Sequence, residues 1–185
     1  MKNPYLFGYL PFITVICFSL TFGVYTVGFS IELFKEIGLY TGMREFLSDV
    51  ELRVFLLIVY ALLFFIVFSS LKLIGKTIHN TAMLFFSKDE EGLSLKEAQA
   101  GRVIYFIGAL ITATAIQSIV IMVLIFLVTT ILYFMYTVYK LSLFLSIGSM
   151  IGLIMFEVLL WGVFISTIVY IMFKLYNGVL ASLPV

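Results

Sequence analysis

One stretch of this chain restricts its possible folds more than any other. From Val103 to Tyr139 the sequence runs for 37 residues without an Asp, Glu, Lys or Arg, and about 20 apolar residues suffice to cross the hydrocarbon core of a bilayer. The whole chain is similar in character: 63% of its residues are hydrophobic, 11% are charged, and its mean hydropathy is +1.21. Soluble domains average roughly 25% charged residues. Lipid rather than water must therefore surround this chain.

The charge-free intervals predict how often the chain crosses the membrane. A single helix over Val103–Tyr139 would be about 55 Å long, much longer than a hydrocarbon core of about 30 Å requires. We therefore predict an all-α, polytopic helix bundle of about five transmembrane helices with a turn near residues 115–118; the alternative is four helices, with one long third helix. The spans predicted in this single membrane domain (1–185) are 10–34, 52–74, 103–117, 120–139 and 149–173, with a cytoplasmic loop at about 75–102.

Lysine and arginine residues beside the span ends predict the orientation, because cytoplasmic ends carry an excess of them. On the side of the N-terminus lie Lys2, Lys72, Lys76, Lys88, Lys96, Arg102 and Lys140, and on the other side lie Lys35, Arg44, Arg53 and Lys174. The N-terminus is therefore predicted to be cytoplasmic. The four-span alternative keeps the same seven-to-four ratio but moves the C-terminus from the outside to the inside.

Two short motifs predict where helices begin. Ser48 with Glu51, and Ser94 with Glu97, have the spacing of the reciprocal capping box, in which a serine and a glutamate satisfy the first free backbone N–H groups. The segment from Gly75 to Ser87 is interpreted as a polar-tipped extension of the second span, slightly in preference to a separate interfacial helix. His79 within it is expected to be solvated or interfacial.

Glu157 is the one ionisable residue deep inside a predicted span. Counting about 1.5 Å per residue from the start of its helix places it near the bilayer middle, where a charged carboxylate is costly. We expect it to face other helices, with Gln117, Thr112 or Thr114 as candidate polar neighbours. Two interpretations stay open: a proton or cation site in a transport path, or a neutral carboxylic acid that holds helices together by hydrogen bonding.

Gly148 and Gly152 form a GxxxG pattern at the start of the last span, and this spacing allows two helix backbones to approach closely. Packing within the chain and formation of a homodimer both explain the pattern. We interpret the two glycines as helix-packing residues.

The sequence offers little material for catalysis. A single histidine and a single cysteine, Cys17, allow no multi-histidine site, no thiolate cluster and no internal disulfide. Phosphate-binding glycine loops and serine nucleophile motifs are absent from the sequence, and a net charge of +1 does not favour nucleic-acid binding. We expect no enzyme activity, no cofactor and no metal, with the lipid bilayer as the main partner.

Two segments resemble a known family. The run Leu84-Phe85-Phe86-Ser87-Lys88-Asp89-Glu90-Glu91-Gly92 with Ser94-Leu95-Lys96, and the ending from Lys174-Leu175-Tyr176-Asn177 through Ala181-Ser182-Leu183-Pro184-Val185, are similar to the YufK-like family of uncharacterised multi-pass membrane proteins from Bacillus and its relatives. The resemblance implies a bacterial cytoplasmic membrane location. It supplies no activity, substrate or catalytic residue.

Two hypotheses about function follow. The first is a structural or accessory membrane protein that packs against its own copies, as a homo-oligomer, or against a larger membrane complex. The alternative is a small proton- or cation-coupled permease subunit that uses Glu157.

Overall fold

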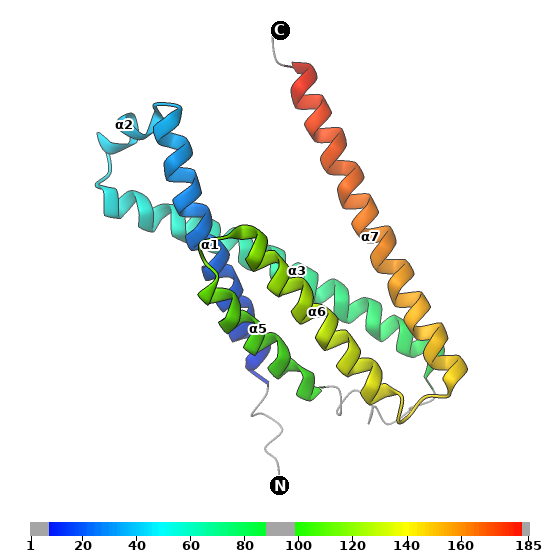
Figure 1. Ribbon diagram of the computed structural model, residues 1–185. Helices are drawn as coiled ribbons and strands as arrows, with labels where there is room; N and C mark the ends of the chain where they lie inside the picture. The colour runs from blue at the N-terminus through cyan, green and yellow to red at the C-terminus, as the bar shows by residue number, and fades with distance from the viewer. Residues whose placement is uncertain (1–7, 88–98, 183–185) are drawn as a thin grey trace.

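The computed structural model describes residues 8–87 and 99–182, and every regular element in these two ranges is a helix. In chain order they are α1 (Leu10–Glu36), α2 (Leu39–Arg44), α3 (Asp49–Phe86), the short 3-10 helix η1 (Gln99–Gly101), α5 (Arg102–Thr114), α6 (Ile119–Leu141) and α7 (Ile147–Ser182). In Figure 1, α3 crosses α1 and reaches α7 at its far end, and the two chain termini lie at opposite ends of the molecule. Four helices, α1, α3, α6 and α7, are long and apolar enough to cross a membrane. The predicted class, a polytopic helical membrane protein, is confirmed.

Helices α1 and α3 cross at the centre of the bundle. A small residue and several aromatic rings lie at this crossing. A Cβ atom on Gly23 would lie only 3.2 Å from the backbone nitrogen of Ala61, so this glycine lets the two backbones approach closely. Next to the crossing, ring centroids 5.3–6.2 Å apart link five phenylalanines of α1, α3 and α6: Phe18, Phe22, Phe64, Phe68 and Phe126. In lipid, close packing of this kind rather than the hydrophobic effect holds helices together.

Helix α3 begins at the predicted capping box. The backbone N–H of Glu51 donates to Ser48 Oγ (3.3 Å), and the backbone N–H of Ser48 donates to Glu51 Oε2 (2.8 Å). The helix runs for 38 residues to Phe86, so the interpretation of Gly75–Ser87 as an extension of the second span is correct up to Phe86. The cytoplasmic location of the segment at 75–102 stays a prediction. The second predicted capping box, at Ser94, lies outside the described residues.

The long charge-free run contains two helices instead of one. Helix α5 ends at Thr114 and α6 begins at Ile119, where the Ser118 hydroxyl caps the new helix by accepting from the backbone N–H of Ile121 (3.5 Å). The alternative of one continuous third helix is therefore wrong. Helix α5 has 13 residues, about 20 Å at 1.5 Å per residue, and is too short for a conventional span. The described residues thus form five principal helical segments, of which four have the length of a membrane span.

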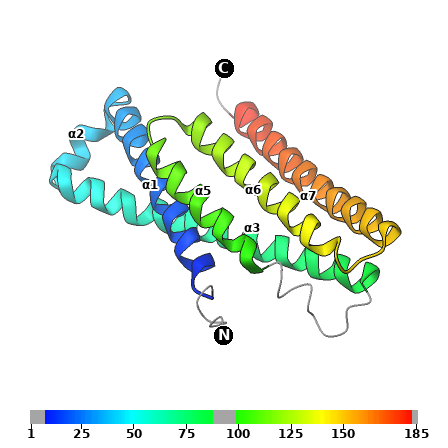
Figure 2. The same ribbon diagram turned by 60° about the horizontal axis from the view of Figure 1, so that its bottom comes forward.

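Helix α7 is also longer than expected. It runs for 36 residues and ends nine residues beyond the predicted boundary at 173. Its first half packs on α3, whereas residues 162–181, which we call the α7 arm, are exposed apart from the half-buried Phe164. Figure 1 shows α7 leaning away from the other helices toward its C-terminal end, and Figure 2 shows its first turns beside the end of α3.

Candidate functional site

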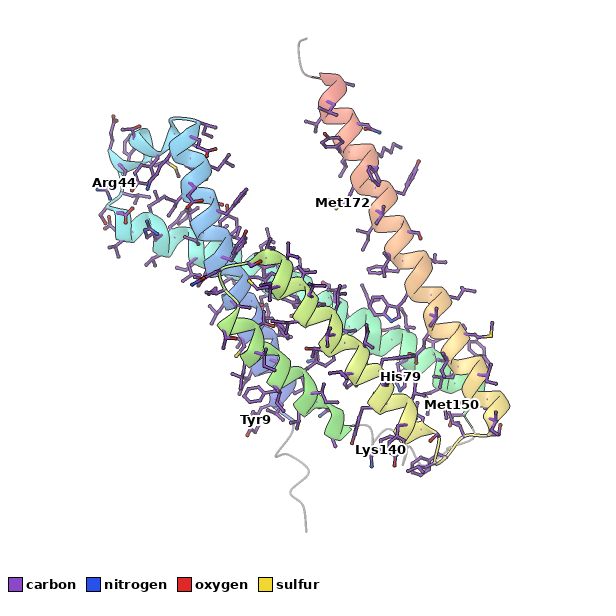
Figure 3. All side chains as sticks on the ribbon, viewed as in Figure 1. Tyr9, Arg44, His79, Lys140, Met150 and Met172 are labelled. Atoms are coloured by element: carbon purple, nitrogen blue, oxygen red, sulfur yellow. The ribbon has the colours of Figure 1, made fainter. Side chains whose placement is uncertain are left out.

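The most distinctive polar contact of the structure joins α3 to α7. His79 Nδ1 lies 2.7 Å from Glu157 Oε1, and the two side chains are 19% and 8% exposed. Among the charged side chains that the structure describes, Glu157 is the one that is buried. A buried carboxylate needs a hydrogen-bonding or charged partner, and the imidazole supplies one. Figure 3 shows His79 on α3 at the place where α7 comes closest.

On both sides of the His79–Glu157 contact, a glycine of one helix faces an aromatic ring of the other. These contacts fix the register of α3 and α7. A Cβ on Gly75 would lie 3.3 Å from the Trp161 ring, and a Cβ on Gly152 would lie 2.5 Å from Phe86. Between these contacts, Ala82, Met83, Leu141 and Leu153 form a buried cluster. Residues of α3 therefore meet residues of α7 in an antiparallel order, with His79 opposite Glu157.

This register also places Glu157 relative to the charges of α3. Its partner His79 follows Lys72 and Lys76, which come directly after the charge-free segment from Val54 to Leu71. The depth of Glu157 in the bilayer stays a prediction.

The three predicted polar neighbours of Glu157 lie elsewhere. Thr112 is buried, and its hydroxyl donates to the backbone carbonyl of Gly108 (2.8 Å), while the Thr114 hydroxyl donates to that of Ile111 (2.8 Å). Gln117 is exposed in the turn between α5 and α6. Helix α5 packs on α1 and α6 and does not contact α7, so these side chains cannot reach the carboxylate. The hypothesis of such neighbours is wrong.

The two glycines of the GxxxG pattern have different surroundings. Gly152 faces Phe86 of α3, as described above, so here the missing side chain makes room for an aromatic ring. Gly148 has open space where its Cβ would be. Of the two predicted packing residues, Gly152 therefore packs against another helix of the same chain, and Gly148 does not.

The partnership of His79 with Glu157 was not predicted from the sequence. A signal was present, because His79, Ala82, Met83 and Phe86 follow one another at helical spacing on one face of α3. Ala82 and Met83 on this face are buried, and the side chain of His79 is half-buried. A histidine within an apolar stripe indicates a packed side chain with a specific partner rather than a solvated one.

The His79–Glu157 pair can form a hydrogen bond or an ion pair and can hold a proton. An imidazole N–H can donate to the carboxylate, either as a neutral dipole or as a cation in an ion pair, and one proton can be held between the two groups. In the described ranges, no group of three or more His, Cys, Asp and Glu side chains is placed to hold a metal ion. The arrangement supports helix pairing directly, and proton exchange only if a path leads to it.

A second polar cluster lies at the other end of α3. Tyr40 of α2 donates its hydroxyl hydrogen bond to Asp49 (2.6 Å), which also pairs with Arg53 (2.9 Å). The hydrogen bond to this carboxylate raises the pKa of the Tyr40 hydroxyl. Because Asp49 and Arg53 are substantially exposed, the cluster ties α2 to the start of α3 and adds little stability by its charges.

These features define a class: a polytopic α-helical membrane protein in which a largely buried acid–base pair joins two of the described helices. Comparison with known sequences identifies the family. The chain belongs to a family of unknown function (DUF5366), whose sequence profile matches residues 27–184. It is similar to the "Uncharacterized membrane protein YufK" of Bacillus subtilis (strain 168), with 39% identity over 185 residues that cover 100% of both chains. The resemblance found in the sequence is thereby confirmed. No solved structure matches the chain.

We predict that the His79–Glu157 pair stabilises the contact between α3 and α7. Changing either residue alone, as His79→Leu or Glu157→Leu, leaves the other polar group buried, and should lower the free energy of unfolding by about 1–3 kcal/mol. The double variant removes both polar groups and should cost at least about 1 kcal/mol less than the sum of the single changes. Denaturant unfolding in mild detergent measures all three values.

Asn80→Leu is the matched control, because Asn80 is the exposed neighbour of His79 on the same helix. It should change the free energy of unfolding by less than about 0.5 kcal/mol. Additive effects of the two single changes would contradict an energetic coupling between His79 and Glu157.

Proposed function

We propose that this protein is a structural or accessory component of the bacterial cytoplasmic membrane that associates with other transmembrane helices by helix packing. The partner helices belong to further copies of the chain or to a larger membrane complex. In this role the chain itself catalyses no reaction. The observation that carries the proposal is the α7 arm, residues 162–181.

The arm has the properties of a helix that meets another helix. At 1.5 Å per residue its 20 residues extend for about 30 Å, the thickness of a hydrocarbon core. Its side chains are exposed on every face except at the half-buried Phe164. Gly162 and Ser166, one turn apart, line a shallow hollow together with Leu159, Val163, Thr167 and Tyr170. Small residues at this spacing allow close approach of a second helix.

Photo-cross-linking in native membranes tests the association. A photoreactive residue at position 166 of the α7 arm should form adducts with protein, of the mass of a second copy or of a partner. The same residue at Leu124, an exposed position of α6, should form adducts mainly with lipid. In addition, Gly162→Leu fills the hollow and should reduce the protein adducts at position 166 several-fold, because the partner helix can no longer approach.

Gly148→Leu serves as the matched control, because Gly148 lies on the same helix and also has open space around its Cβ position. It should leave the adducts unchanged. If position 166 gives only lipid adducts, as position 124 does, the α7 arm faces lipid and the proposal is wrong.

The orientation forms part of this proposal: the N-terminus in the cytoplasm and the C-terminus outside. Two observations support it: the seven-to-four excess of basic residues on the N-terminal side, and the position of the two termini at opposite ends of the molecule (Figure 1). A reporter that is active only in the cytoplasm should therefore be active when fused before Met1 and inactive when fused after Val185. Activity of the C-terminal fusion would reverse this assignment.

The His79–Glu157 pair favours a second candidate, a proton- or cation-coupled permease subunit. A buried carboxylate 2.7 Å from an imidazole is an arrangement that can take up and release a proton. The accessory role predicts that vesicles containing the purified protein pass protons no faster than empty vesicles, as read by a pH-sensitive dye inside them. A proton flux that Glu157→Gln abolishes, while the exposed control Glu51→Gln preserves it, would establish the permease instead.

A further inference from the structure

The polar side chains of the α7 arm share one face of an otherwise apolar helix. With about 3.6 residues per turn, five of its six polar residues fall within an arc of about 100°. They are Ser166, Thr167, Tyr170, Lys174 and Asn177. Polar side chains of a helix in lipid face protein or water rather than acyl chains. This face therefore marks the side of the arm on which a partner lies.

Several groups of this face have no partner within residues 8–87 and 99–182. The Thr167 hydroxyl donates to the backbone carbonyl of Val163 (2.8 Å). No side-chain hydrogen bond of this part of the chain reaches the hydroxyls of Ser166 or Tyr170, and no acid in it lies within ion-pair distance of Lys174. These groups are available to another helix. We call Gly162, Ser166, Tyr170 and Lys174, which follow one another at intervals of four residues, the arm stripe.

Helix α1 has an exposed stripe with the same spacing. Leu20, Val24, Gly28 and Glu32 are exposed and also follow one another at intervals of four residues. A Cβ on Gly28 would have open space around it, and an exposed small residue allows a second helix to come close. We call these four residues the α1 stripe. It ends in an acid, whereas the arm stripe ends in a base.

The acids at the end of α1 are not neutralised by a neighbouring cation. Among the residues that the structure describes, no Lys, Arg or His lies within ion-pair distance of Glu32 or Glu36. Lys35, between them in the chain, lies over the Tyr40 ring instead, 5.1 Å from its centroid. Residues 32–53 contain five acids and three basic residues. This end of the molecule therefore carries a net negative charge and attracts a cation.

Glu32 and Lys174 occupy corresponding positions on their helices. Glu32 is the first charged residue after the charge-free segment of α1, and Lys174 is the first after the charge-free segment of α7 that follows Glu157. Figure 1 shows α1 and α7 running in the same direction, toward the end of the molecule at which α2 lies. If two copies have the same orientation in a membrane, α1 of one and α7 of the other therefore pack in parallel, with the two charges at a similar level.

In this parallel alignment the stripes also match in size. When Lys174 is set beside Glu32, each step of four residues along both helices brings a larger side chain against a smaller one. The pairs are Tyr170 with Gly28, Ser166 with Val24, and Gly162 with Leu20. Gly152 and Phe86 make the same kind of contact inside the chain. The two stripes are thus complementary in charge and in shape.

We propose that the arm stripe of one copy packs along the α1 stripe of a second copy, with Lys174 of the first paired with Glu32 of the second. The proposal rests on the association of the α7 arm proposed above and names its partner. Within one chain, the described parts of α1 and α7 are not in contact. Two arms do not pair with each other in copies of the same orientation, because Lys174 would then lie beside Lys174 and like charges repel.

Disulfide cross-linking between two differently tagged copies in native membranes tests this contact. In a Cys17→Ser background, one copy carries Val24→Cys and the other carries Ser166→Cys, and the two are expressed together. Mild oxidation should join both tags in one product, because the proposed contact brings these two positions together. The matched control combines Ser166→Cys with Leu124→Cys on the exposed side of α6, and it should yield several-fold less of the joined product.

Charge reversal tests the ion pair within the contact. Lys174→Glu in the Ser166→Cys copy should lower the disulfide yield several-fold, because two carboxylates then face each other. Glu32→Lys in the Val24→Cys copy should restore the yield, and this rescue also shows that the Lys174→Glu variant is folded. Arg44→Glu removes a cation at the same end of the molecule but outside the contact, and it should leave the yield unchanged.

Two results would overturn the contact. The first is absence of the disulfide between positions 24 and 166 while a photoreactive residue at position 166 still forms adducts with protein; the association of the arm then stands, with a different partner. The second is a disulfide yield that does not respond to Lys174→Glu, or that Glu32→Lys does not restore. Lipid adducts alone at position 166 refute the association itself, and this contact with it.

Discussion

Hydrocarbon offers no hydrogen-bond partners, and this constraint governs where each polar group of the chain is placed. Backbone groups satisfy one another inside helices, which in lipid is one of the few ways to do so. Most described Ser and Thr hydroxyls in the apolar helices follow the same rule and donate to a backbone carbonyl one turn earlier, for example Ser19 to Val15 (2.6 Å) and Thr129 to Ile125 (2.7 Å). Such hydroxyls have no donor left for contacts between helices and can only accept there, as Thr130 does from Tyr105.

Few side-chain hydrogen bonds therefore connect different long helices in the described ranges. Ser30 pairs with Tyr60, Tyr105 pairs with Thr130, and His79 pairs with Glu157. The rest of the bundle depends on shape, with Gly23 at the crossing of α1 and α3 and a group of phenylalanine rings beside it. Of these three contacts, His79–Glu157 is the one that involves α7. Helix α7 meets α3 over its first half only.

Local chemistry made much of the fold predictable from the sequence. The absence of charge identified the apolar helices, the Ser48 capping box located the start of α3, and the excess length of Val103–Tyr139 required an interruption. Each of these signals depends on residues that are close together in the chain. They also showed that Glu157 would need a partner, because a carboxylate in an apolar helix cannot be left without one.

The identity of that partner depends on which helices are neighbours, and no local signal contains this information. Thr112, Thr114 and Gln117 were reasonable candidates by polarity, but α5 packs on the side of the bundle away from α7. His79 was interpreted as solvated or interfacial because it lies beyond the charge-free part of α3. The extension of this helix to Phe86 was expected, but nothing near His79 in the chain indicated that α7 would cover it.

The short helix α5 makes the two arms of its hairpin unequal. With 13 residues α5 measures about 20 Å, whereas α6, with 23 residues, measures about 34 Å. Gln117 at the tip between them is exposed and needs water or headgroups around it. Because only the longer arm has the length of a membrane span, the seat of this hairpin in a bilayer is set by α6, and α5 follows it.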